Sequence, residues 1–132
     1  MSRVNVEALR VGYSSFNEGN PEWFLAKLDA GFVYRARQEL PGGGDFEGRE
    51  AFGDRIAALR DVFAEVHFEP EEFVEAGDLV VVVLRQTARG RTSGAALEQS
   101  ITHVWRIENG TPRELRVFSD HAEALEAVGL PG

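Results

Sequence analysis

The sequence predicts an α+β domain in which three helices pack on one antiparallel sheet. Two observations carry this prediction. Early in the chain, apolar residues recur at steps of three and four, as they do on one face of a helix. After Phe63 this period stops, and strand-like segments follow, separated by turn signals. We therefore expect the element order α-α-β-α-β-β-β-β with a short C-terminal helix.

The first helix is expected over residues 5–18, because Val6, Leu9, Tyr13 and Phe16 share one face. A second helix should begin after Asn20, a good N-cap residue followed by a proline, and end near residues 29–31.

A strand is expected over residues 32–38, followed by a glycine-rich loop at 41–45. Residues 46–50 then lead into a third helix. Its apolar stripe consists of Phe52, Ile56, Leu59 and Phe63.

Four further strands are expected over residues 66–75, 79–88, 97–107 and 114–119. Pro70 interrupts the first of them, which suits an edge strand or a bulge. Residues 108–110 predict a hairpin turn that contains a positive-φ position. Asp120 should cap the terminal helix.

The run from Val80 to Val83 is apolar on both faces of its strand, so both faces need cover. Three helices can cover one face, and a second subunit would cover the other. We therefore expect a homodimer through the outer face of the sheet. The alternative is that this strand simply lies at the centre of the sheet.

The composition and net charge argue against several classes of partner and chemistry. The chain of 132 residues predicts a single domain over 1–132. Its net charge of −8 argues against binding to nucleic acid or to an anionic membrane surface. Without cysteine it has no disulfides or thiolate chemistry, and no signal-peptide pattern is visible, so we expect a cytoplasmic protein. No metal or cofactor motif is present, so none is expected.

Five short motifs resemble those of the NTF2-like superfamily and of its SnoaL-like members. They are F-N-E-G-N, F-E-G-R-E-A, G-D-L-V-V, H-V-W-R-I-E-N-G and D-H-A-E-A-L-E-A-V-G-L, at residues 16–20, 46–51, 77–81, 103–110 and 120–130. The resemblance covers nearly the whole chain. It implies an NTF2-like cone, in which a strongly curved antiparallel sheet wraps against the helices and encloses a conical pocket, and usually a dimer. It does not imply one activity, because this superfamily includes cyclases, isomerases, hydrolases, dehydratases and binding modules.

Two known chemistries of the superfamily fit poorly. The resemblance places Ala36 or Arg37 where ketosteroid isomerase has its catalytic base, and Gly12, beside Tyr13, where it has its oxyanion tyrosine. An epoxide-hydrolase arrangement needs an Asp–Arg–Asp set. Arg85 and Asp120 could belong to such a set, but a second aspartate on a strand is missing.

His103 is the best candidate for acid–base chemistry, because imidazole titrates near neutral pH. Asp120 could orient it or act itself. The alternatives are that His103 is a core residue bonded to a backbone or tyrosine partner, or lies at the dimer interface, and that Asp120 only caps the last helix.

The remaining candidates would line the pocket and bind a ligand. They are Tyr13, Phe16, Tyr34, Arg85, Trp105 and Phe118. The aromatic residues among them could equally be core residues, and Arg85 could pair with Glu98 across neighbouring strands.

These observations predict a protein that binds a small, largely apolar molecule. It could act as a cofactor-free cyclase, isomerase or dehydratase with His103 as acid or base. The competing hypothesis is a non-catalytic binding or dimerisation module, favoured by the lack of a complete acid–base pair.

Overall fold

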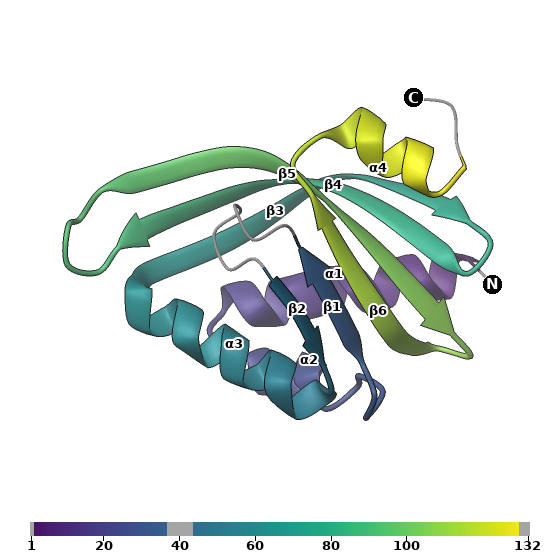
Figure 1. Ribbon diagram of the computed structural model, residues 1–132, viewed down its shortest axis with the longest axis horizontal. Coiled ribbons are helices and arrows are strands. Elements are labelled where there is room, and N and C mark those ends of the chain that lie inside the picture. The colour runs from purple at the N-terminus through teal and green to yellow at the C-terminus, as the bar shows by residue number, and fades with distance from the viewer. Residues whose placement is uncertain (1, 37–43, 130–132) are drawn as a thin grey trace.

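The computed structural model describes residues 2–36 and 44–129, and it has the expected α+β architecture (Figure 1). Within these ranges the elements in chain order are α1 (Ser2–Asn17), α2 (Pro21–Leu25), β1 (Val33–Ala36), β2 (Gly44–Glu47), α3 (Arg49–Val62), β3 (Phe63–Ala76), β4 (Leu79–Gly90), β5 (Ala96–Glu108), β6 (Thr111–Phe118) and α4 (His121–Ala127).

The sheet contains one strand more than the sequence predicts, and it is mixed. Its order is β2-β1-β6-β5-β4-β3, and β1 runs parallel to β6, whereas all other pairs are antiparallel. The extra strand, β2, begins at Gly44, which belongs to the glycine-rich segment for which the sequence predicts a loop. It pairs with β1 so that Phe46 lies opposite Tyr34, with ring centroids 5.9 Å apart.

Several local predictions are confirmed. A bulge lies between Pro70 and Glu72, and β3 is an edge strand. Asn109 and Gly110 have φ values of 53° and 77°, so the turn between β5 and β6 has the expected positive-φ geometry. Phe63, expected in the third helix, is instead the first residue of β3, with extended φ and ψ of −113° and 132°.

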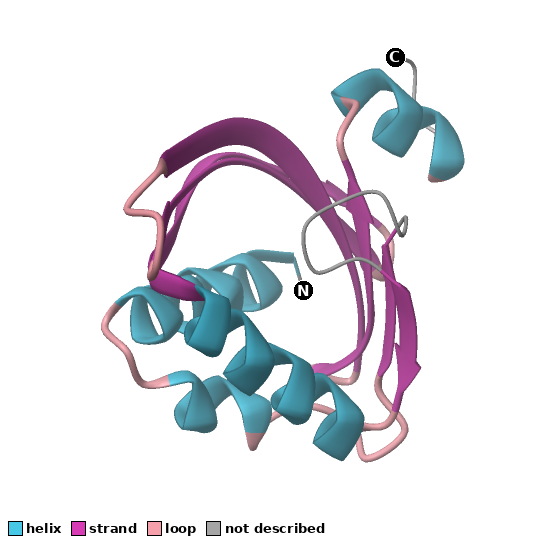
Figure 2. Cartoon of the chain, turned by 60° about the vertical axis from the view of Figure 1, so that its left-hand side comes forward, coloured by secondary structure: helices cyan, strands magenta, loops and turns pink. Residues whose placement is uncertain are grey.

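The sheet curves around α1, α2 and α3, which lie on its concave side, while α4 lies on the convex side (Figure 2). The main core fills the space between the concave face and these helices. Its least exposed members come from every layer, and they include Leu9, Phe32, Val82 and Leu84.

Helices α1 and α2 approach closely at Gly12. A Cβ atom at this position would lie 2.5 Å from Cδ1 of Phe24, closer than two carbon atoms can pack. Glycine is therefore required here for α2 to lie against α1, and it opens the space in which the Phe24 ring packs.

The convex face has its own apolar cluster, which α4 covers. Val81 and Val104 are fully buried there, under Ala124, Leu125 and Phe118. Val81 is thus covered on the outer face within one chain, whereas Val83, which shares that face, is only partly buried. Helix α4 therefore covers part of the outer face, which the argument for a second subunit did not include. The homodimer itself stays a prediction.

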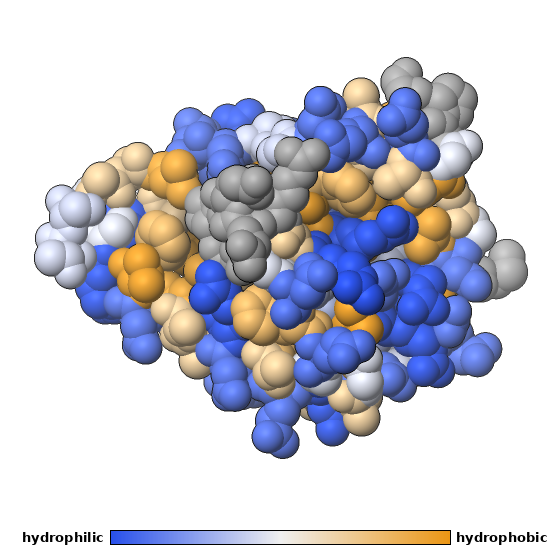
Figure 3. All heavy atoms as spheres, viewed as in Figure 1, coloured by the Kyte–Doolittle hydropathy of each residue, from blue (hydrophilic) through white to orange (hydrophobic). Residues whose placement is uncertain are grey.

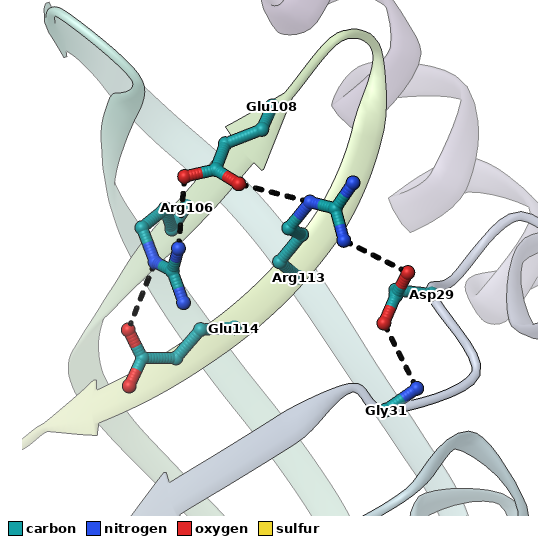
Figure 4. A network of polar contacts seen from close by, with 6 residues as sticks. All are labelled: Asp29, Gly31, Arg106, Glu108, Arg113 and Glu114. Atoms are coloured by element: carbon teal, nitrogen blue, oxygen red, sulfur yellow. Dashed lines mark hydrogen bonds and ion pairs between the residues drawn. The ribbon is translucent and has the colours of Figure 1, made fainter.

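The rest of the convex face near β6 carries charged pairs. Glu108 binds Arg106 through one oxygen at 2.9 Å and lies 2.9 Å from Nε of Arg113 through the other (Figure 4). Arg113 also pairs with Asp29, and Arg106 with Glu114. Hydrophilic side chains dominate the space-filling view over this region (Figure 3). This charged surface does not resemble the apolar patch of an obligate dimer interface.

Candidate functional site

A cavity of about 90 Å³ lies between the concave face of the sheet and the three helices. Helices α1, α2 and α3 form one side, and strands β1, β3, β5 and β6 form the other. The lining residues are Leu9, Gly12, Tyr13, Phe16, Pro21, Phe24, Leu25, Tyr34, Phe52, Arg55, Ile56, Leu59, Phe68, His103, Trp105 and Leu115. Most of these side chains are apolar or aromatic, as in a site for a small organic molecule.

Three buried side chains form a hydrogen-bond chain in the wall of this cavity. The indole N–H of Trp105 donates to the hydroxyl oxygen of Tyr13 at 2.9 Å, and this hydroxyl lies 2.8 Å from Nδ1 of His103. Trp105 and His103 lie two residues apart on β5, so both side chains point to the concave face. Tyr13 reaches them from α1.

The chain of bonds fixes the proton positions. An indole N–H can only donate, so Tyr13 accepts from Trp105. If Nδ1 also donated to Tyr13, the hydroxyl proton would have no acceptor among the described residues. Tyr13 therefore donates to Nδ1 of His103. A neutral His103 then carries its proton on Nε2, for which no hydrogen-bond partner exists within residues 2–36 and 44–129.

Burial determines the charge of this group. Desolvation lowers the pKa of His103 to about 3, because the apolar surroundings disfavour the imidazolium form. Burial likewise raises the pKa of Tyr13 above its ordinary value, against a smaller opposing effect of the bond from Trp105. At neutral pH both groups are uncharged, and His103 offers an N–H donor to the cavity.

Tyr34 and Arg55 add polar groups elsewhere on the wall. Burial raises the pKa of Tyr34, while the positive charge of Arg55 acts in the opposite direction, so the two side chains lie near each other. The guanidinium carbon of Arg55 lies 5.8 Å from the ring centroid of Phe46. The Tyr34 ring packs between Phe46 and Phe52, with centroid distances of 5.9 and 5.1 Å.

The end of α1 is tied to the edge strand beside this cavity. The side-chain amide of Asn17 donates to the carbonyl of Phe68 at 2.7 Å, and its oxygen accepts from the Phe68 N–H at 2.9 Å. These two bonds satisfy backbone groups on the free edge of β3 and hold the Phe68 ring against Phe16, with centroids 5.2 Å apart.

Five of the residues predicted from the sequence line this cavity: Tyr13, Phe16, Tyr34, Trp105 and His103. His103 also has the tyrosine partner that was the alternative to a ligand-contacting role. The histidine thus combines a core hydrogen bond with a place on the cavity wall.

The other three predicted residues lie elsewhere. Arg85 lies on the convex face because it alternates along β4 with the inward Leu84. It is half exposed there and pairs with Glu98 at 3.0 Å and with Glu71 at 3.2 Å. Phe118 packs in the convex cluster under α4. Asp120 caps α4 by accepting from the N–H of Ala122 at 2.9 Å, and it does not contact His103.

Sequence reasoning missed Arg55 as a cavity residue. It lies three positions after Phe52 and one before Ile56, on the face of α3 that carries the apolar stripe. A charged residue on the otherwise apolar face of this helix was the sequence signal that could have identified Arg55 as a cavity residue.

Within the described part of the chain, no three His, Asp or Glu side chains are grouped so that they could hold a metal ion. No helix in the same ranges is both long and apolar enough to cross a membrane.

The chain resembles known proteins in sequence pattern and in fold. Residues 10–114 match the pattern of the SnoaL-like domain. An NTF2-like protein of unknown function from Burkholderia pseudomallei K96243 superposes with a TM-score of 0.79 and 25% identity, over 98% of this chain and 99% of that one.

Two further solved structures are similar. TerC, co-crystallised with polyporic acid, has a TM-score of 0.78 and 21% identity, over 95% of this chain and 97% of its own. A protein described as a SnoaL-like polyketide cyclase, from Jannaschia sp. CCS1, has a TM-score of 0.76 and 21% identity, over 98% and 94%. A search of the curated proteins found no match.

Proposed function

The chain belongs to the SnoaL-like domain family, and from this premise we propose that its cavity binds a small, largely apolar ring molecule through an oxygen that accepts from Nε2–H of His103. The observation that carries the proposal is the hydrogen-bond chain from Trp105 through Tyr13 to His103, which leaves the Nε2–H donor of His103 on a mostly apolar wall.

The size of the cavity supports a ligand of about one ring. Its volume of about 90 Å³ is below the roughly 300–1,000 Å³ of drug-sized sites. It is closer to the engineered cavity of about 150 Å³ that binds benzene. TerC, which shares the fold, was co-crystallised with polyporic acid, and this supports a small organic molecule as the ligand.

The same geometry supports one form of catalysis, the stabilisation of an enolate. When a proton leaves the carbon beside a carbonyl group, negative charge develops on the carbonyl oxygen. A neutral imidazole N–H held in a water-poor site stabilises that charge without a change in its own protonation. This would serve a cofactor-free cyclase, isomerase or dehydratase.

In this reaction His103 acts as a hydrogen-bond donor and not as the base that removes the proton. Its Nδ1 lone pair is occupied by Tyr13, and its low pKa makes it a weak base. Among the described lining residues there is no carboxylate to take that role. Binding is therefore the primary proposal, and proton removal would depend on a group brought by the substrate.

A thermal-shift comparison tests the binding proposal. Acetophenone and ethylbenzene have nearly the same shape, but only acetophenone has a carbonyl oxygen. We expect acetophenone to raise the Tm of the protein more than ethylbenzene does, and we expect His103→Leu to remove the difference. A lack of stabilisation by both compounds at their solubility limits would overturn the proposal.

A further inference from the structure

Phe68 brings an aromatic ring to the cavity wall from the edge of the sheet. The rings of Phe52 and Trp105 on the same wall are buried in the main core, whereas Phe68 is only partly buried and belongs to β3, an edge strand. The centroid of its ring lies 5.5 Å from that of His103 and 5.2 Å from that of Phe16. A ligand bound to His103 therefore has Phe68 among its nearest neighbours on the wall.

The backbone of Phe68 is held by one side chain on the free side of its strand. Among the described residues, β3 pairs with β4 alone. On the other side, the N–H of Phe68 donates to the side-chain oxygen of Asn17 at 2.9 Å, and its carbonyl accepts from the Asn17 amide at 2.7 Å. Asn17 thus supplies at this point the bonds that a neighbouring strand gives to an inner strand.

The end of α1 that carries Asn17 is itself tied to α3. Arg60 donates from Nη2 to the carbonyl of Phe16 at 3.2 Å, and its guanidinium carbon lies 5.1 Å from the centroid of the Phe16 ring. The touching rings of Phe16 and Phe68 are therefore fixed to three elements, α1, α3 and β3. Such a wall resists displacement by a ligand that is too large for the cavity.

We propose that Phe68 limits the ligand to about one ring, and that Asn17 is the positioning residue that holds the Phe68 ring in place. The cavity then accepts single-ring ketones and rejects ketones with two fused rings. This proposal rests on the proposed function, since it uses the same cavity and the same bond to His103. It goes further by naming a residue that determines specificity and a second residue that acts through it.

The test compares acetophenone with 2-acetonaphthone, which has the same carbonyl group and one more fused ring. Binding is measured by isothermal titration calorimetry. The larger ketone can bury more apolar surface, and this alone favours it. We nevertheless expect the unchanged protein to bind acetophenone about tenfold more tightly, because atoms that a packed wall cannot accommodate cost binding free energy.

Two substitutions on β3 locate the size limit. Phe68→Leu removes the ring and keeps an apolar side chain, so it should bind 2-acetonaphthone at least as tightly as acetophenone. Phe73→Leu is the matched control, because Phe73 is partly buried on the same strand and contacts Arg10 but does not line the cavity. It should leave the preference for acetophenone intact.

A third substitution tests the positioning role. Asn17→Ala should weaken the preference, because the Phe68 backbone loses both of its bonds to α1. Asp120→Ala likewise removes a side chain that accepts from two backbone N–H groups, but at α4, and it should not change the preference. In the double variant Asn17→Ala/Phe68→Leu, the loss of Asn17 should add nothing to the effect of Phe68→Leu, because there is no ring left to position.

The outcomes separate this proposal from the proposed function. If the unchanged protein binds both ketones equally, or if Phe73→Leu abolishes the preference as Phe68→Leu does, Phe68 does not determine the size limit, while the binding function stands. If Asn17→Ala affects the preference no more than Asp120→Ala does, or if its effect adds to that of Phe68→Leu, the positioning role is refuted. If neither the unchanged protein nor Phe68→Leu binds either ketone, the proposed function itself is contradicted.

Discussion

The substitution Tyr13→Phe tests the hydrogen-bond chain on which the site depends. It removes one oxygen and keeps the ring, which is 7% exposed and packs on Phe68, His103 and Trp105. The indole N–H of Trp105 and Nδ1 of His103 then lose their partner together. An unsatisfied buried group costs about 1–3 kcal/mol, so two of them should lower the free energy of unfolding by about 2–6 kcal/mol.

The assay is urea denaturation, in which the midpoint should fall while the m-value stays constant. The control is the double variant Tyr13→Phe/His103→Leu. Because replacing both partners with apolar groups removes the unsatisfied nitrogen, the double variant should be more stable than the sum of the single effects predicts, by about 0.5–3 kcal/mol. A loss below about 0.5 kcal/mol for Tyr13→Phe, the range of a surface substitution, would refute the bonding scheme.

Three further predictions concern pH, packing and capping. An unfolded histidine takes up its proton near pH 6.5, but folded His103 does so only near pH 3, so the unfolded chain binds more protons between these values and stability falls as pH decreases. Urea titrations should show that the free energy of unfolding falls by about 2 kcal/mol from pH 7 to pH 5 in the unchanged protein but not in His103→Leu. An equal decrease in both proteins would contradict this prediction. Gly12→Ala should cost about 1–3 kcal/mol despite the better helix propensity of alanine, because its Cβ would meet Phe24; an unchanged Tm would show that α2 can shift freely. Asp120→Ala should cost about 1 kcal/mol and speed amide exchange in α4, and unaltered exchange would mean that the cap contributes little.

The fold could be predicted largely from the sequence, because its signals are local. The helical stripes, the turn at Asn109 and Gly110, and the bulge beside Pro70 each depend on a few neighbouring residues. The parallel pairing of β1 with β6 joins strands far apart in the chain. No local pattern predicts such a pairing, which is why it could not be foreseen.

The site was only partly predictable, because a cavity depends on which face of a strand each residue occupies. A run of four valines carries no inward or outward signal, so the face of Arg85, which follows it closely, could not be assigned. The structure places Leu84 inward and Arg85 outward. The face of Phe118 depends likewise on its register with β5, where it lies opposite Thr102.

The partnership of Tyr13 with His103 was beyond sequence reasoning for the same reason. The two residues are 90 positions apart, and the bond depends on how α1 lies across the sheet. Each residue could be placed on an inward face by its own period, but their contact and the resulting tautomer required coordinates. The proton on Nε2 follows from the Trp105 donor together with the lack of another acceptor for the Tyr13 hydroxyl proton among the described residues.

The most direct test of the central claim is the ¹⁵N NMR spectrum of the His103 side chain at neutral pH, recorded with and without acetophenone. We predict a neutral imidazole protonated at Nε2 in the free protein, whose Nε2–H resonance moves on titration while Nδ1 stays bonded to Tyr13. A free imidazole protonated at Nδ1, or an Nε2 resonance that does not move up to the solubility limit of acetophenone, would contradict the claim.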